Sequence, residues 1–223
     1  MKSMKKVRIL LADDHQILRD GLRTLLNTQE DMEVIAEADT GRKAIDLALC
    51  HCPDVLVMDV VMPELNGIEA TNQLKKDLPE IKVLALSMHA DRRFVAEMLK
   101  AGASGFLLKE CAFQELAEAI RSIIKGKMYL SPSISKCVIE EYVGFLSGDE
   151  KEHTDSESAL SHREKEVLQL IAEGKANRDI AKTLHISVKT VETHKYNIMR
   201  KINLHSVAEL TKYAIKSGLT PID

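Results

Sequence analysis

Five short apolar runs alternate with helical patterns in the N-terminal part of the chain, and this alternation constrains the fold more than any other feature. Each run breaks off at polar or small residues; the runs are Val7 to Ala12, Val34 to Ala36, Val55 to Met58, Ile81 to Leu86 and Gly105 to Leu108. Short uninterrupted apolar runs are typical of strands buried on both faces. Strands that alternate with helices predict a parallel sheet covered by helices on both sides.

The segments between the runs have helical spacing. In the last of them, apolar residues recur every three or four positions and stop before Gly126; they are Phe113, Leu116, Ala117, Ile120, Ile123 and Ile124. This period predicts an amphipathic helix that a glycine ends. In open parallel sheets, ligands bind beyond the carboxyl ends of the strands, where the winding reverses. The residues that directly follow the strands are therefore the candidates for chemistry.

Polar residues stand at four of these five strand ends. Asp13 and Asp14 follow the first strand, Asp59 the third, Ser87 the fourth and Lys109 the fifth. Because the carboxyl ends of parallel strands share one edge, we expect these side chains to converge. Three neighbouring carboxylates repel one another unless a cation is bound or a pKa shifts. An all-oxygen set with room for water suits Mg²⁺.

Asp59 would then lie beside a Lewis acid. A carboxylate in that position can act as a nucleophile towards a phosphoryl group and form an aspartyl phosphate. Lys109 and Ser87 fit the task of binding the phosphoryl oxygens. Alternatively, the strand-end aspartates only cap the following helices, as Asp14 would before a helix near Gln16. The convergence of five polar residues favours the phosphoacceptor site.

Four motifs resemble the receiver domain of bacterial response regulators, over residues 5–127: Leu11-Ala12-Asp13-Asp14-His15, Met58-Asp59-Val60-Val61-Met62-Pro63, Leu86-Ser87, and Lys109 before a helix. The resemblance implies a doubly wound, five-stranded parallel sheet of the flavodoxin-like type, with strand order 2-1-3-4-5. It also implies that Asp59 accepts phosphate from a sensor histidine kinase and that Lys109 holds the phosphoryl group. The implied magnesium ligands are Asp13, Asp14, Asp59 and the backbone carbonyl of Val61.

At several positions the residue in this sequence is a variant of the one usual in receiver domains. Ser87 stands where threonine is more usual, and it keeps the hydroxyl expected to move towards the phosphate. Phe106 occupies the aromatic switch position without a hydroxyl, so its rotation is expected to depend on packing alone. Glu110 follows Lys109 where many receivers carry proline; a cis peptide there would cost about 2.5–4 kcal/mol, and its geometry is left open. Gly67 is expected to form a tight loop before a helix.

The chain is expected to divide into a receiver domain at 1–127, a partly helical linker at 128–158 and a C-terminal domain at 159–223. Ser131-Pro132 can open a helix with apolar positions Ile134, Val138, Ile139 and Tyr142. The acidic, apolar-poor segment from Ser147 to Ser158 reads as a spacer. No apolar stretch is long enough to cross a bilayer, and we expect a cytoplasmic protein.

The C-terminal domain is predicted to be an all-α, four-helix, helix-turn-helix fold. Ser161-His162-Arg163-Glu164 is a capping box that opens a helix before Gly174. Asn177 is expected to cap the second helix and Ser187 the third, with a short join between them. The inward positions expected for the third and fourth helices are Val191, Ile198, Ile202, Val207, Leu210, Ala214 and Ile215.

The third of these helices carries the candidate DNA contacts. Residues 161–223 hold 11 Lys and Arg against seven Asp and Glu, whereas the whole chain carries a net charge of −3. A basic region favours a polyanion partner, and a helix fits the major groove. The candidates on the non-core faces are Lys189, Thr190, Glu192, Thr193, Lys195 and Tyr196. The alternative is an ordinary solvated helix face.

Residues Leu160 to Leu219 resemble the LuxR-type helix-turn-helix, notably at Glu166-Val167-Leu168, Ala172-Glu173-Gly174 and Val188-Lys189-Thr190-Val191. The whole chain thus resembles a response regulator of the NarL/FixJ class. The resemblance assigns DNA phosphates to Lys189, Thr190 and Lys195, and base reading to Glu192, Thr193 and Tyr196. It implies a phosphorylation-controlled transcription factor. The implied partners are a sensor histidine kinase, double-stranded operator DNA with paired half-sites, a second copy of the phosphorylated chain and, as a candidate, RNA polymerase.

Two functions of other classes compete with this interpretation. An aspartyl-phosphate phosphatase would need a substrate pocket with cap elements, which the compact repeat leaves no residues to build. A protein-docking module at the C-terminus would lack the salt dependence that DNA binding requires. Beyond its own phosphoryl transfer and dephosphorylation, no enzyme activity is expected.

Overall fold

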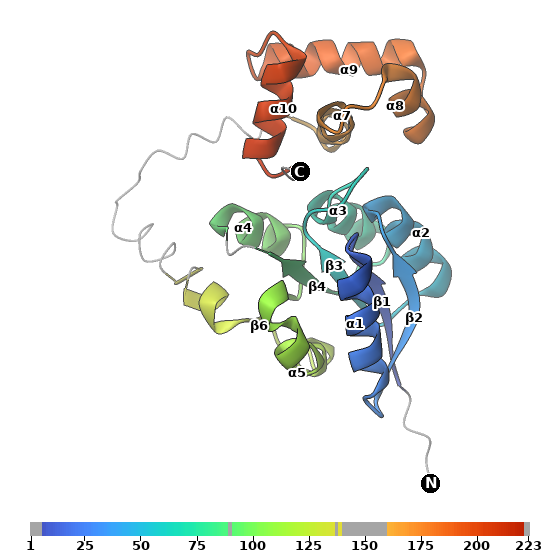
Figure 1. Ribbon diagram of the computed structural model, residues 1–223, viewed down its shortest axis with the longest axis vertical. Helices are drawn as coiled ribbons and strands as arrows, with labels where there is room; N and C mark the ends of the chain where they lie inside the picture. Colours follow the sequence, from blue (N-terminus) through green and yellow to red (C-terminus); the bar gives the residue numbers. More distant parts are fainter. Residues whose placement is uncertain (1–5, 89–90, 137, 140–159, 221–223) are drawn as a thin grey trace. The chain divides into compact units, whose positions relative to one another are not determined.

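The computed structural model describes residues 6–88, 91–136, 138–139 and 160–220. These residues form two compact units, an α/β unit and an all-helical unit, each with its own apolar core (Figure 1). Most of the expected linker, including Tyr142 and the acidic spacer, lies outside the described residues. Within the described ranges, no helix has the length and apolar character to cross a membrane.

The first unit is built on one parallel sheet with strand order β2-β1-β3-β4-β5-β6. The strands are β1 (Val7–Ala12), β2 (Met32–Ala38), β3 (Val55–Asp59), β4 (Lys82–Ser87), β5 (Gly105–Leu108) and β6 (Tyr129–Leu130). The predicted order of the first five strands is confirmed. The predicted number of strands was wrong, because β6 adds a sixth strand at the edge beside β5.

Strand β6 extends the sheet beyond residue 127, where the receiver domain was expected to end. Gly105 permits its close approach, because a Cβ there would lie 2.7 Å from the carbonyl oxygen of Tyr129. After the strand, the backbone N–H of Ser131 donates to the carbonyl of Phe106 over 3.2 Å. Residues 132–136 are then helical, as the Ser131-Pro132 pair predicted. The beginning of the expected linker is therefore attached to β5.

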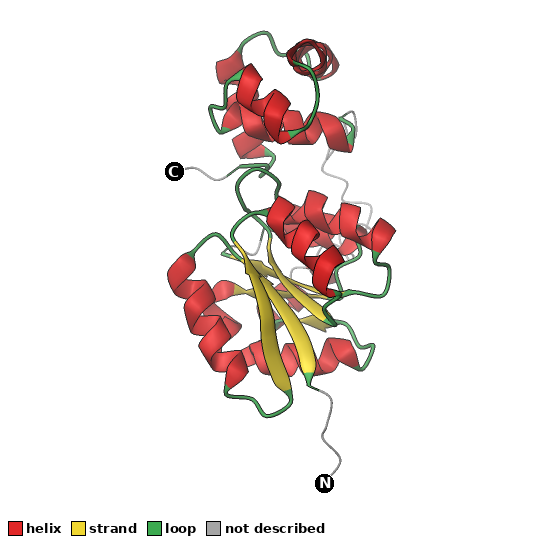
Figure 2. Cartoon of the chain, turned by 90° about the vertical axis from the view of Figure 1, so that its right-hand side faces the viewer, coloured by secondary structure: helices red, strands yellow, loops and turns green. Residues whose placement is uncertain are grey.

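Helices cover both faces of the sheet, as predicted (Figure 2). On one face, α1 (Gln16–Asn27) and α5 (Ala112–Ile124) pack against each other and against an apolar core that includes Ile9, Val57 and Leu107. The other face carries α2 (Gly41–His51), α3 (Gly67–Asp77) and α4 (Arg92–Lys100), which pack in that order (Figure 1). A short 3₁₀ turn, η1 (Lys109–Cys111), joins β5 to α5. This layering leaves the carboxyl edge of the strands to the loops.

The second unit consists of α7 (His162–Ala172), α8 (Asn177–Thr183), α9 (Val188–Lys201) and α10 (Val207–Lys216). Ser161 and Glu164 form the predicted capping box, and Ser187 caps α9 by accepting from the Thr190 N–H. Two details of the prediction were wrong. Ala176, not Asn177, is the N-cap of α8, because the helix already begins at Asn177. Val207 is 44% exposed, since it lies in the first turn of α10, before the buried Leu210 and Ala214.

Candidate functional site

Two buried carboxylates and one buried ammonium meet at the carboxyl edge of the sheet. Asp13 follows β1, Asp59 ends β3 and Lys109 follows β5, and each is at most 5% exposed. The Lys109 Nζ lies 2.6 Å from Asp59 Oδ2 and 2.8 Å from Asp13 Oδ2. The three side chains therefore converge as the sequence predicted, and one ammonium bridges two carboxylates.

The electrostatics of this cluster favour an additional cation. Burial raises the pKa of Asp59 to about 7; the attraction of Lys109 opposes this rise, whereas the charge of Asp13 adds to it. Burial alone would lower the pKa of Lys109, but the attraction of Asp59 and Asp13 outweighs it and raises that pKa. Lys109 therefore stays cationic at neutral pH, and this single ammonium is shared between the two buried carboxyl groups of Asp13 and Asp59.

A metal ion would find oxygen ligands at this edge. Asp13, Asp14, His15 and Asp59 each offer one ligand atom, and these atoms all lie within 4.8 Å of one another. Asp14 is exposed, and the N-cap of α1 is His15, so Asp14 does not cap that helix. The three carboxylates, with one open to water, fit Mg²⁺. His15, which the sequence analysis did not single out, places its Nδ1 2.8 Å from Asp14 Oδ1.

The other residues predicted for the phosphoacceptor site lie at the same edge of the sheet or in the strands that end there. The Val61 N–H donates to Asp59 Oδ1 over 3.3 Å. Ser87 is buried at the end of β4, paired in register with Leu108, so it stands beside the start of η1. Phe106 is completely buried in β5. The Lys109-Glu110 peptide, whose geometry the sequence left open, is trans.

Gly67 packs directly against the backbone of Asp59. The prediction of a simple loop glycine did not include this contact. Its N–H donates to the Val60 carbonyl over 2.9 Å, and a Cβ at this position would lie 2.0 Å from the Asp59 carbonyl oxygen. No side chain fits in that space. The first residue of α3 and the end of β3 are thus packed backbone against backbone.

Helix α9 presents the candidate DNA contacts of the second unit. Val191 and Ile198 are buried in the core, which fixes the orientation of the helix. Tyr196 is 66% exposed. Of the other candidates, Lys189, Glu192 and Thr193 are exposed, and Thr190 and Lys195 are partly so. The six predicted side chains therefore lie outside the core.

Comparisons with known proteins assign both units. Residues 9–121 match the response regulator receiver domain, and residues 158–214 match the luxR family of bacterial regulatory proteins. The chain belongs to the response regulators. It is 41% identical to the oxygen regulatory protein NreC of Staphylococcus haemolyticus, over 96% of this chain and 99% of that protein. It is 38% identical to the transcriptional regulatory protein DegU of Brevibacillus brevis, over 96% and 94% of the two chains.

Solved structures agree with this assignment. The structure of two RcsB dimers bound to two parallel DNAs is 27% identical, covers 96% of this chain and 99% of that one, and has a TM-score of 0.58. The present chain has a receiver domain and a LuxR-type DNA-binding domain, and it is a phosphorylation-dependent transcriptional regulator of a two-component system. The predicted family and the general function of a two-component transcriptional regulator are confirmed, whereas the roles of individual residues stay predictions.

Proposed function

We propose that Asp59 accepts a phosphoryl group from a phosphohistidine of a sensor kinase and that this reaction controls DNA binding. The observation that carries the proposal is the buried Lys109 ammonium within ion-pair distance of both Asp59 and Asp13. An Asp59 oxygen attacks phosphorus, a P–O bond forms, and the P–N bond to the kinase histidine breaks. Lys109 then holds a phosphoryl oxygen and offsets its charge.

The Asp13, Asp14 and Asp59 carboxylates, with the Val61 carbonyl, would hold Mg²⁺ at this edge. Bound there, the ion supplies charge neutralisation for the carboxylates and the phosphoryl oxygens. The fit is supported by the ligand atoms of Asp13, Asp14 and Asp59, which lie within 4.8 Å of one another. The aspartates provide the oxygen ligands. The Lys109 ammonium, which pairs with Asp13 and Asp59, reduces the repulsion between these two carboxylates.

Phosphorylation would be reported through Ser87 and Phe106. The Ser87 hydroxyl moves towards the phosphoryl oxygens, and Phe106 repacks in response. Because Phe106 has no hydroxyl and is completely buried, its alternative positions differ in apolar packing rather than in a terminal hydrogen bond. The change shifts a two-state equilibrium towards a homodimer that binds paired half-sites of operator DNA in the cytoplasm.

The surface around the phosphoacceptor supports a protein donor. A hollow of about 470 Å³ is lined by four apolar side chains, Ile17, Leu18, Met88 and Phe113, together with His15, Lys109 and Glu110. Ile17 is 91% exposed, an unusual position for a large apolar side chain on α1. We assign this patch to docking of the sensor histidine kinase. The variant Ile17→Asp should slow transfer from the kinase, whereas labelling by acetyl phosphate should be unchanged.

In the DNA-binding domain, α9 enters the major groove. Lys189, Thr190 and Lys195 would contact phosphates, which position the helix. The residues assigned to base reading are Glu192, Thr193 and Tyr196. The exposure of Tyr196 and the buried Val191 and Ile198 support this orientation. RNA polymerase is a candidate further partner of the DNA-bound dimer.

The decisive experiment is acetyl-phosphate labelling of the full chain with and without magnesium, followed by sedimentation and DNA-fragment binding in the same samples. Native protein should be labelled at Asp59 only with magnesium, and labelling should raise dimerisation and DNA affinity. The variant Asp59→Asn should keep its fold but take up no phosphate. Equal labelling of that variant would overturn the assignment of Asp59.

A further inference from the structure

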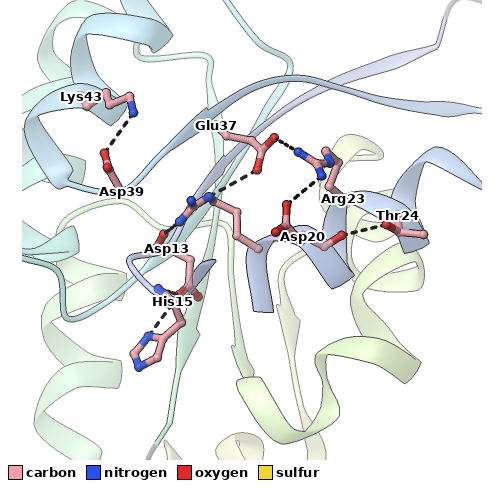
Figure 3. Close-up of polar contacts among 9 residues, drawn as sticks. Asp13, His15, Asp20, Arg23, Thr24, Glu37, Asp39 and Lys43 are labelled. Carbon is pink, nitrogen blue, oxygen red and sulfur yellow. Dashed lines mark hydrogen bonds and ion pairs between the residues drawn. The ribbon is translucent and has the colours of Figure 1, made fainter. Parts of the chain in front are cut away.

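A chain of charged side chains leads from the surface of the receiver domain to the backbone of Asp13. Arg19, on α1, donates from Nη1 to the Asp13 carbonyl over 2.5 Å. Its Nε lies 3.3 Å from Glu37 Oε2 on β2. The other Glu37 oxygen pairs with Arg23 at 2.6 Å, and Arg23 pairs with Asp20 at 2.7 Å (Figure 3). One guanidinium therefore connects this chain to the loop after β1.

The contacts of Asp13 show what Arg19 adds. Asp13 Oδ1 accepts the His15 N–H over 2.9 Å, and its Oδ2 pairs with Lys109. Arg19 donates its hydrogen bond to the backbone carbonyl of Asp13 rather than to a carboxylate oxygen. That carbonyl lies in the same peptide plane as the nitrogen of Asp14. Fixing that carbonyl fixes the direction in which Asp14 leaves β1. Both carboxylates then depend on the orientation of one peptide unit.

Arg19 is itself held firmly. Its side chain is 16% exposed, and its planar guanidinium binds two partners at once from different nitrogens. Glu37 is in turn restrained by Arg23. We propose that Arg19 is a positioning residue for the magnesium site, acting through the peptide between Asp13 and Asp14. This inference rests on the proposed function, because it presupposes that the site binds Mg²⁺.

The sign of the effect separates positioning from simple charge. A cation near a divalent metal site repels the metal, so removing it for its charge alone would strengthen magnesium binding. Loss of positioning has the opposite effect, and loss of residues that orient ligands typically weakens metal affinity by about 10- to 100-fold. Arg19→Lys keeps the charge, but an ammonium cannot reproduce the two-armed contact. A weaker site in this variant can therefore come only from geometry.

The test is a magnesium titration of the isotope-labelled full chain, followed by the NMR signals of the β1–α1 loop. We expect binding to weaken by about tenfold in Arg19→Ala and Arg19→Lys, and less in Glu37→Gln. The control is Lys43→Ala, which removes an exposed lysine of α2 that pairs with Asp39 at 3.1 Å (Figure 3). Its affinity should remain within about twofold of the native value.

Each result decides between the hypotheses. Unchanged or tighter binding in both Arg19 variants would overturn the positioning role while leaving the proposed function intact. Equal weakening in Lys43→Ala would overturn it too, because the effect would then be general. If native protein binds no magnesium, the proposed function itself fails. If Arg19→Ala does not fold, Arg19→Lys and Glu37→Gln carry the test, and native affinity in both would overturn the inference.

Discussion

Gly67 shows how one missing side chain sets the position of the phosphoacceptor. A Cβ at this position would overlap the Asp59 carbonyl at 2.0 Å, so Gly67→Ala must push α3 away from β3 or displace Asp59. Overpacking of this kind costs about 1–3 kcal/mol. We expect acetyl-phosphate labelling to slow by at least about tenfold, which corresponds to about 1.4 kcal/mol in activation free energy. Single-turnover labelling measures this rate.

The control for that variant is a glycine at the end of α5. Gly126 has a φ of +77°, and a Cβ there would meet no atom within 4 Å. Gly126→Ala should therefore lower stability by about 1 kcal/mol through backbone strain alone. It should leave labelling unchanged. Equal slowing of both variants would mean that stability, not the position of Asp59, limits the reaction.

At this scale the sequence predicted the residues whose position follows from strand order. Asp13, Asp59 and Lys109 could be predicted to meet because each follows a parallel strand. Arg19 could not, because the partner of a helix surface residue depends on how the helix is rotated and where β2 ends. The role of Gly67 was missed for a related reason: a close approach between two backbones leaves no pattern in the sequence.

At the scale of elements, β6 and the turn after it lead to a prediction about a buried hydroxyl. Ser131 is fully buried, and its Oγ has no hydrogen-bond partner among the described residues. A buried hydroxyl without a partner costs about 1–3 kcal/mol. Ser131→Ala should therefore stabilise the receiver domain by up to about 1 kcal/mol, after the loss of packing is subtracted. Thermal unfolding measures the change, and a destabilised variant would show that the hydroxyl is bonded in solution.

The capping box of α7 makes the stability of the DNA-binding domain depend on pH. Burial alone would raise the pKa of Glu164, but Lys201 at 2.6 Å and the donors of Ser161 outweigh it and lower that pKa. A lowered folded pKa stabilises the domain above the unfolded pKa, and this contribution disappears as pH falls through the folded value. At pH 7, Glu164→Gln should cost about 1–2 kcal/mol, discounted for the partly exposed Lys201.

This variant should also lose less stability on acidification than the native protein does, because the group that titrates is gone. Urea unfolding followed by NMR signals of α7, at pH 7 and at pH 4, measures both effects. Glu209 serves as the control, since it forms the same capping box on α10 with the pKa lowered by the His205 and Ser206 donors. It is exposed, so Glu209→Gln should have the smaller effect. Equal effects would mean that burial of Glu164 is unimportant.

For the whole molecule, the order and class of the two domains could be predicted because each has its own hydrophobic period and capping signals. The edge strand β6 could not be predicted, because Tyr129–Leu130 is too short to show alternation of apolar and polar residues. Its pairing also depends on Gly105 in the neighbouring strand β5. Its tyrosine gains a partner that only the fold supplies. The hydroxyl donates to Glu115 over 3.0 Å, and burial together with that carboxylate raises the pKa of Tyr129 to about 12.

The last prediction concerns DNA affinity. If Lys189 contacts a phosphate, Lys189→Ala should weaken binding to every sequence by a similar factor, because phosphates carry no sequence information. The slope of log affinity against log salt should fall by about 1, since one fewer counterion is released. The control is Lys212→Ala, an equal loss of charge from an exposed position on α10.

Filter binding of phosphorylated protein to operator and unrelated fragments over a salt series measures both the affinity and its salt dependence. A loss confined to the operator would instead make Lys189 a base-reading residue, and an equal loss in the control would reduce its role to general charge.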